Sequence, residues 1–120
     1  MAELQMGELE SQFADFIWSN EPVATSDIVR IGEIQFDWKK STTYTVLKRL
    51  CDKGIFQNNG GIVTSLISRD DYYAFQSERF VQNNFNDSLP QFLNAYTTRR
   101  MFTPEEIEYI RSIVDEYDGN

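Results

Sequence analysis

The fold of this chain is constrained most tightly by residues 55–67, where two short apolar runs surround a strong turn sequence. The runs are Ile55-Phe56-Gln57 and Ile62-Val63-Thr64-Ser65-Leu66-Ile67, and Asn58-Asn59-Gly60-Gly61 lies between them. Asn and Gly tolerate the backbone angles of tight hairpin turns, so this pattern predicts a two-stranded β-hairpin. The segments before it carry helical patterns.

Two amphipathic helices are predicted in the first 37 residues, separated by Ser19-Asn20-Glu21-Pro22. In residues 8–18, ending at Trp18, apolar side chains recur at helical spacing: Leu9, Phe13, Phe16 and Ile17. The second helix is expected to have Thr25 as its N-cap and Gly32 in its interior, where glycine costs about 1 kcal/mol relative to alanine. Its inner side is expected to carry Ile28, Ile31 and Ile34.

A third helix is predicted over residues 38–53, with Gly54 as a left-handed cap. One side carries an apolar stripe at i, i+3, i+4 and i+7: Thr43, Val46, Leu47 and Leu50. The remaining surface carries short hydroxyls, a tyrosine and cations: Lys39, Lys40, Ser41, Thr42, Tyr44, Thr45, Lys48 and Arg49. Its N-cap is left open between Asp37 and Ser41.

Side chains of these types can hold phosphates and read base edges in a DNA groove, although an ordinary solvated helix face would carry the same residues. Three helices followed by a hairpin is the order of a winged helix-turn-helix domain, in which the third helix is the recognition helix. The element order and the basic face therefore favour the same function for residues 38–53.

From residue 69 onward the chain is predicted to be helical and to serve as a dimerisation region. A break at Asn86-Asp87-Ser88 precedes a short helix with Pro90 in its first turn, and residues 97–100 are expected to form an exposed link. The last helix has a capping box at Thr103 and Glu106. Because three such helices cannot enclose a core, a second copy is expected to cover the following residues: Tyr73, Phe80, Phe85, Phe92, Ile107, Ile110 and Val114. The alternative is a monomer in which these helices fold back on the winged-helix domain.

Composition excludes several classes of site. The 120 residues contain no histidine and only one cysteine, Cys51, so catalytic dyads with histidine, zinc clusters and an internal disulfide are not expected, and no cofactor or metal is predicted. No apolar run is long enough for a membrane span and the first residues lack a signal-peptide pattern, which favours a cytoplasmic protein.

Charge is distributed unevenly along the chain. The net charge is −8, yet residues 38–53 carry a local charge of +4 and residues 101–120 carry −5. Such a protein can bind a polyanion through one face, but only weakly unless symmetry doubles the cations.

The pattern resembles the penicillinase and methicillin-resistance repressor family and its copper-responsive relatives. The resemblance covers nearly the whole chain and is carried by the residues Trp18, Thr25, Trp38, Thr42, Thr45, Leu47, Arg49, Leu50, Lys53 and Gly54, with the capped last helix at Thr103. It implies a winged-helix domain over residues 1–67 and a helical dimerisation region over residues 68–120. It also implies a homodimeric repressor that binds a palindromic operator in double-stranded DNA.

Family members are released from DNA when a sensor-protease pathway cuts the dimerisation half. The corresponding bond falls near Ala95 and Tyr96, although the family's Asn-Phe pair is not reproduced there. The cysteine motif of the copper-responsive members is absent, and the wing lacks the family's usual basic residues. A winged-helix module that binds proteins and has lost DNA binding is therefore the alternative function, and an enzyme is a distant third.

Overall fold

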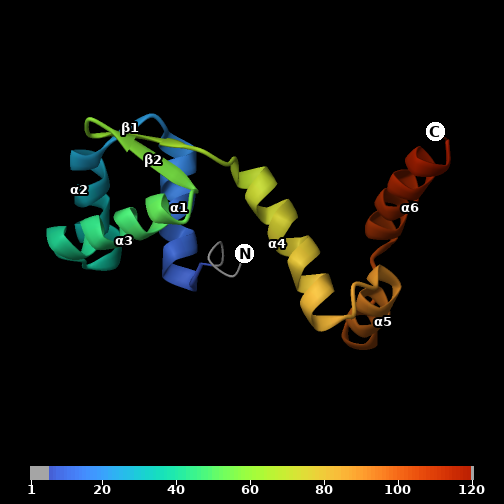
Figure 1. Cartoon of the computed structure of the whole chain (residues 1–120). Helices are drawn as coiled ribbons and strands as arrows, with labels where there is room; N and C mark the ends of the chain where they lie inside the picture. Colours follow the sequence, from blue (N-terminus) through green and yellow to red (C-terminus); the bar gives the residue numbers. More distant parts are fainter. Residues whose placement is uncertain (1–5, 120) are drawn as a thin grey trace. The chain divides into compact units, whose positions relative to one another are not determined.

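The computed structural model describes residues 6–119, which form six helices and three short strands (Figure 1). Their order is α1 (Glu8–Asn20), β1 (Val23–Ala24), α2 (Thr25–Phe36), α3 (Lys40–Asp52), β2 (Phe56–Asn59), β3 (Ile62–Ser65), α4 (Arg69–Asn84), α5 (Leu89–Arg99) and α6 (Pro104–Asp118). This mainly helical chain with a small antiparallel sheet confirms the predicted winged helix-turn-helix domain followed by C-terminal helices. None of the described helices is long and apolar enough to cross a membrane.

The described residues fall into two compact units that divide between Gln76 and Ser77, inside α4. We call them the N-terminal unit and the C-terminal unit. The boundary predicted between residues 67 and 68 divides the chain by function, into a winged-helix domain and a dimerisation region, and it stays a prediction.

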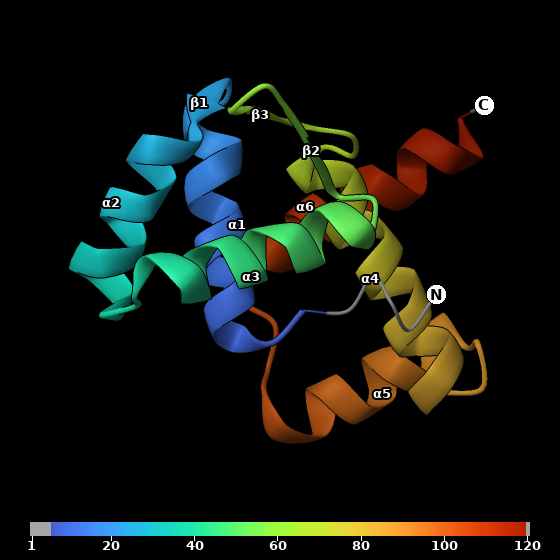
Figure 2. The same cartoon turned by 60° about the vertical axis from the view of Figure 1, so that its left-hand side comes forward.

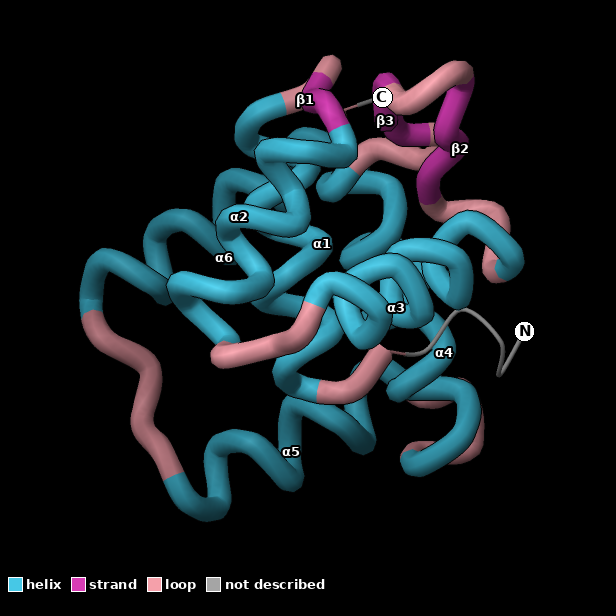
Figure 3. The backbone as a smooth tube through the Cα atoms, turned by 90° about the vertical axis from the view of Figure 1, so that its left-hand side faces the viewer, coloured by secondary structure: helices cyan, strands magenta, loops and turns pink. Residues whose placement is uncertain are grey.

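The N-terminal unit packs α1, α2 and α3 around one core, with the sheet at one end of the helices (Figures 2 and 3). The largest side chains that are fully buried come from α1, α2, α3 and the hairpin: Phe13, Phe56, Ile17, Ile28, Leu50, Ile55, Val63 and Thr43. Tyr72, on α4, is also buried, and the Trp18 indole N–H donates to the Ile67 carbonyl at 3.0 Å. The first turn of α4 is thereby attached to the core.

The predicted hairpin is confirmed, with a two-residue turn. Asn59 pairs with Ile62, and the intervening Gly60 and Gly61 have φ of 61° and 90°, as a type I′ turn requires. The sheet has a third strand that the sequence did not reveal, because β1 is only two residues long; it gives the order β1-β3-β2, with Val23 opposite Val63.

Two expectations for α2 are wrong. Thr25 is the first helical residue rather than the N-cap, and its N–H donates to the Gly61 carbonyl at 2.9 Å, while Ala24 is the N-cap. Ile34 is 70% exposed because a spacing of six residues from Ile28 places it far around the helix from the core stripe.

Gly32 has a packing reason for its place inside α2. It is buried against α3, and a Cβ added there would clash with the Thr43 side chain, lying 3.2 Å from its Cγ2 and closer to its Oγ1. The helix-propensity cost of glycine is therefore accepted so that α2 and α3 can pack closely.

The C-terminal unit contains α5 and α6 together with the end of α4. The Ser88 hydroxyl accepts from the Gln91 N–H at α5, and the predicted capping box of α6 is confirmed by reciprocal bonds between Thr103 and Glu106 at 2.8 and 3.1 Å. The link expected at residues 97–100 is wrong, since α5 continues to Arg99. The hydroxyls of Thr97 and Thr98 donate to carbonyls one turn earlier and are accommodated in the helix.

Candidate nucleic-acid interface

The outer face of α3 is the candidate site, and the core positions it. Thr43, Val46, Leu47 and Leu50 are buried as predicted, which confirms the apolar stripe. The predicted DNA-binding residues are all exposed on the rest of the helix and the residue before it: Lys39, Lys40, Ser41, Thr42, Tyr44, Thr45, Lys48 and Arg49. The hydroxyl of Thr45 donates to the Ser41 carbonyl at 2.9 Å, so the hydrogen-bonding capacity that it retains is that of an acceptor.

The N-terminus of α3 has no side-chain cap. Lys39 occupies the N-cap position with extended backbone angles, and the first helical hydrogen bond runs from the Thr43 N–H to the Lys39 carbonyl at 3.0 Å. Neither Asp37 nor Ser41 serves as the cap, because Asp37 instead ends α2 in the left-handed conformation with φ of 54°. The N–H groups of the first turn are thus available to an anion, beside two lysines.

The other end of α3 is closed by Gly54, with φ of 83°. The Ile55 N–H donates to the Leu50 carbonyl at 3.1 Å and the Gly54 N–H donates to the Cys51 carbonyl at 2.9 Å, the paired bonds of a Schellman motif. The predicted left-handed cap is confirmed. Burial raises the pKa of the nearby Cys51 thiol, with the Asp52 carboxylate adding to the effect, so the thiol stays neutral.

Three of the five cations in residues 38–53 are paired with carboxylates. Lys48 lies 3.0 Å from Asp52, on the same exposed face of α3. Arg49 and Lys53 both turn toward Glu10 on α1, with N–O distances of 3.4 and 3.7 Å. Among residues 6–119, Lys39 and Lys40 have no ion pair.

Sequence reasoning did not find Glu10. It precedes Arg49 by 39 residues, so no local pattern connects them. Including Glu10 lowers the charge of the basic surface from the +4 of residues 38–53 to +3.

The wing contributes no charge to this surface. Its exposed tip is formed by Asn58, Asn59 and Gly60, with Ile62 45% exposed beside them. The Asn58 side chain is used within the turn, where it accepts from the Gly61 N–H at 2.9 Å.

The predicted dimerisation residues fall in two places. Phe80, Phe85 and Phe92 form one aromatic cluster in the C-terminal unit, with ring centroids 5.4 to 6.2 Å apart. Ile107, Ile110 and Val114 lie along α6 of the same unit, and neither α5 nor α6 has a buried residue. Tyr73 lies apart from them in the N-terminal unit, beside Trp18 and Tyr72.

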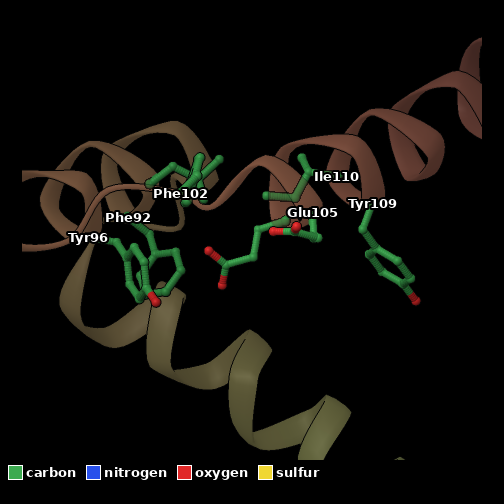
Figure 4. A pocket seen from close by; sticks show the side chains of 8 residues that line it. Phe92, Tyr96, Phe102, Glu105, Tyr109 and Ile110 are labelled. Carbon is green, nitrogen blue, oxygen red and sulfur yellow. The ribbon is translucent and has the colours of Figure 1, made fainter.

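A hollow of about 430 Å³ with a mostly apolar lining separates α5 from α6. Figure 4 shows Phe92 and Tyr96 of α5 at one end of this hollow and Tyr109 and Ile110 of α6 at the other. The two rings of α5 are 6.3 Å apart, and the Tyr96 ring lies 6.0 Å from Phe102. The hollow adds to the apolar surface that this unit leaves uncovered.

The bond between Ala95 and Tyr96, the predicted position of regulatory cleavage, lies inside α5. Both residues are exposed. A protease that needs an extended substrate would require this part of α5 to unwind first.

Comparison with known proteins agrees with this architecture. A family model described as "Penicillinase repressor" matches residues 6–116. The chain belongs to the penicillinase repressor family. Family membership makes it a transcriptional repressor and not an enzyme.

The similarity to individual family members is low but extends over nearly their whole length. The methicillin resistance regulatory protein MecI of Staphylococcus aureus strain Mu50 is 22% identical over 116 residues, which cover 93% of this chain and 94% of that protein. The MecI proteins of Mammaliicoccus sciuri and Staphylococcus epidermidis are each 21% identical over the same shares.

Proposed function

We propose that this repressor acts as a homodimer that binds a palindromic operator in double-stranded DNA, with α3 of each subunit in the major groove. The observation that carries the proposal is the outer face of α3. It is exposed along its length, it carries hydroxyls and cations, and its N-terminal N–H groups have no side-chain cap. Helices of this kind in winged-helix proteins present their first turns to the DNA.

Different parts of the face would have different roles. Lys39, Lys40 and Arg49 would hold phosphates, which fixes the orientation of the protein on the duplex. The residues that would approach base edges are Ser41, Thr42, Tyr44, Thr45 and Lys48. Lys39 and Lys40 are well placed for a phosphate, because both lie at the positive end of the α3 dipole and neither has an ion pair among the described residues.

The C-terminal unit supports the dimer. It leaves large apolar side chains exposed on α5, in the connection to α6 and on α6 itself, including Tyr96 at 38%, Met101 at 89% and Tyr109 at 69%. Contiguous apolar surface of this kind marks an interface, and a twofold dimer would also double the cations presented to DNA. Release of the dimer by a sensor-protease pathway, with cleavage near Ala95 and Tyr96, belongs to the same proposal.

One observation favours a second function. The uncharged wing and the pairing of Arg49 and Lys53 with Glu10 leave few cations for DNA, as expected for a winged-helix module that binds another protein. DNA titrations distinguish the two functions.

The test is fluorescence anisotropy with the double-stranded DNA upstream of the gene, at two salt concentrations. We expect salt-sensitive binding, and Lys40→Ala should lower the slope of log affinity against log salt by about 0.9 for each phosphate contact removed. Arg111→Ala, which removes a cation from α6, is the control and should leave the slope unchanged. Absence of binding by the unaltered chain at low salt would support the protein-binding module.

A further inference from the structure

The position of Glu10 points to a role in DNA binding that goes beyond holding α1 and α3 together. Glu10 lies in the first turn of α1, yet its two carboxylate oxygens reach two cations at the end of α3. Oε2 lies 3.4 Å from Arg49 Nη1 and Oε1 lies 3.7 Å from Lys53 Nζ. Oε1 also accepts from the Gly7 N–H at 3.2 Å, which fixes the carboxylate in place.

This contact is less exposed than a typical surface ion pair. The side chains of Glu10 and Lys53 are each only 17% exposed, whereas Arg49 is 52% exposed. Water screens the contact of Glu10 with its two cations incompletely. The electrostatic attraction there is therefore larger than that between the side chains of Lys48 and Asp52, which are 76% and 66% exposed. Arg49 keeps enough exposure to reach a phosphate, but the Glu10 carboxylate beside its Nη1 offsets part of the positive charge that would attract one.

We propose that Glu10 is an affinity-setting residue that competes with DNA phosphates for Arg49, while its contact with Lys53 helps to hold the carboxylate beside that guanidinium. A carboxylate and a phosphate oxygen offer a guanidinium the same kind of hydrogen bond, so one cation cannot satisfy both fully. While Glu10 is charged, the basic surface of α3 is dominated by the lysines at its N-terminus. This inference rests on the proposed binding of DNA by α3.

Phosphate contacts carry no sequence information, which gives the proposal a specific consequence. Loss of the Glu10 charge should strengthen binding to every duplex to a similar degree. Glu10 would thus lower the affinity for non-specific DNA while leaving the ranking of sequences unchanged.

The experiment compares Glu10→Gln with Glu8→Gln. Both substitutions remove one negative charge from the first turn of α1 and keep the size of the side chain, but only Glu10 pairs with α3. Binding to the upstream promoter duplex, and to a scrambled duplex of equal length, is measured by anisotropy over a range of salt concentrations. Thermal unfolding checks that each variant is folded.

Glu10→Gln should bind both duplexes about threefold to tenfold more tightly than Glu8→Gln does at low salt, with a steeper salt dependence. Adding Arg49→Gln to Glu10→Gln should remove most of this gain. Equal affinities for the two glutamine variants, or weaker binding by a folded Glu10→Gln, would overturn the competition. If neither the unaltered chain nor Glu10→Gln binds any duplex, the proposed function fails as well.

Discussion

The two units of this protein differ in how much of their apolar surface they cover by themselves. The N-terminal unit encloses Phe13, Ile17, Leu50 and Phe56 completely. In the C-terminal unit, α5 and α6 have well-formed caps and no buried residue. The local signals for helix formation are therefore as good in the second unit as in the first, but only the first has a core.

This difference shows that helix capping and core formation are separate requirements. The capping box of α6 fixes where the helix begins, and Ser88 does the same for α5. Capping contributes about 1 kcal/mol for each helix, whereas stable folding of a small domain depends on burying most of its apolar side chains. A unit with good caps and exposed apolar faces is expected to depend on a partner.

The largest expected effect is a difference in folding between two fragments that each contain one of the units. A fragment of residues 1–76 should unfold cooperatively on heating, because it contains a closed core. A fragment of residues 77–120 should lack stable helix at low micromolar concentration, since isolated short helices are marginal in water. Circular dichroism at several protein concentrations measures the helix content of both fragments. Helix that persists in the fragment of residues 77–120 at every dilution would show that the C-terminal unit folds without a partner.

A pair of matched substitutions tests the same contrast in the whole chain. Phe56→Ala removes a fully buried ring 5.3 Å from that of Trp18 and should lower the free energy of unfolding by about 3–5 kcal/mol. Phe80→Ala removes a ring that is 52% exposed in the isolated subunit. Its effect should be smaller at low protein concentration and should increase as the dimer forms. Urea denaturation at two protein concentrations measures both losses, and a loss for Phe80→Ala that is the same at both concentrations would argue for a monomer.

The smallest expected effect is a change in the dissociation constant of the dimer. Val114→Asp places a charge in the proposed interface, whereas Ser112→Asp places the same charge on the opposite side of α6. The first should weaken dimerisation by about tenfold or more, equivalent to about 1.4 kcal/mol, and the second should leave it unchanged. Sedimentation equilibrium gives the dimer dissociation constants of the two variants. An unchanged constant for Val114→Asp would show that this face of α6 is not in the dimer interface.

Sequence patterns predicted the elements that depend on local chemistry. The stripe of α3, the turn at Gly60 and Gly61, and the capping box at Thr103 follow from the spacing of a few neighbouring residues, and the structure confirms each. The side chains expected to meet DNA are also exposed as predicted. Their roles in binding stay predictions.

Features that depend on distant parts of the chain were missed. The strand β1 exists because Val23 meets Val63, and Thr25, the first residue of α2, donates its N–H to the Gly61 carbonyl of the hairpin. Glu10 reaches Arg49 only after α1 and α3 have packed into one domain. None of these pairings leaves a periodic signal in the sequence.

The turn that closes the wing also limits how the protein could evolve. Gly60 and Gly61 both have positive φ, a region that residues with a Cβ enter only at a cost. A lysine or arginine introduced at Gly60 or Gly61 would strain the backbone, so a charged wing would be built more readily from the neighbouring strand residues Asn59 or Ile62. Stronger attachment to DNA would thus arise more easily beside the turn than within it.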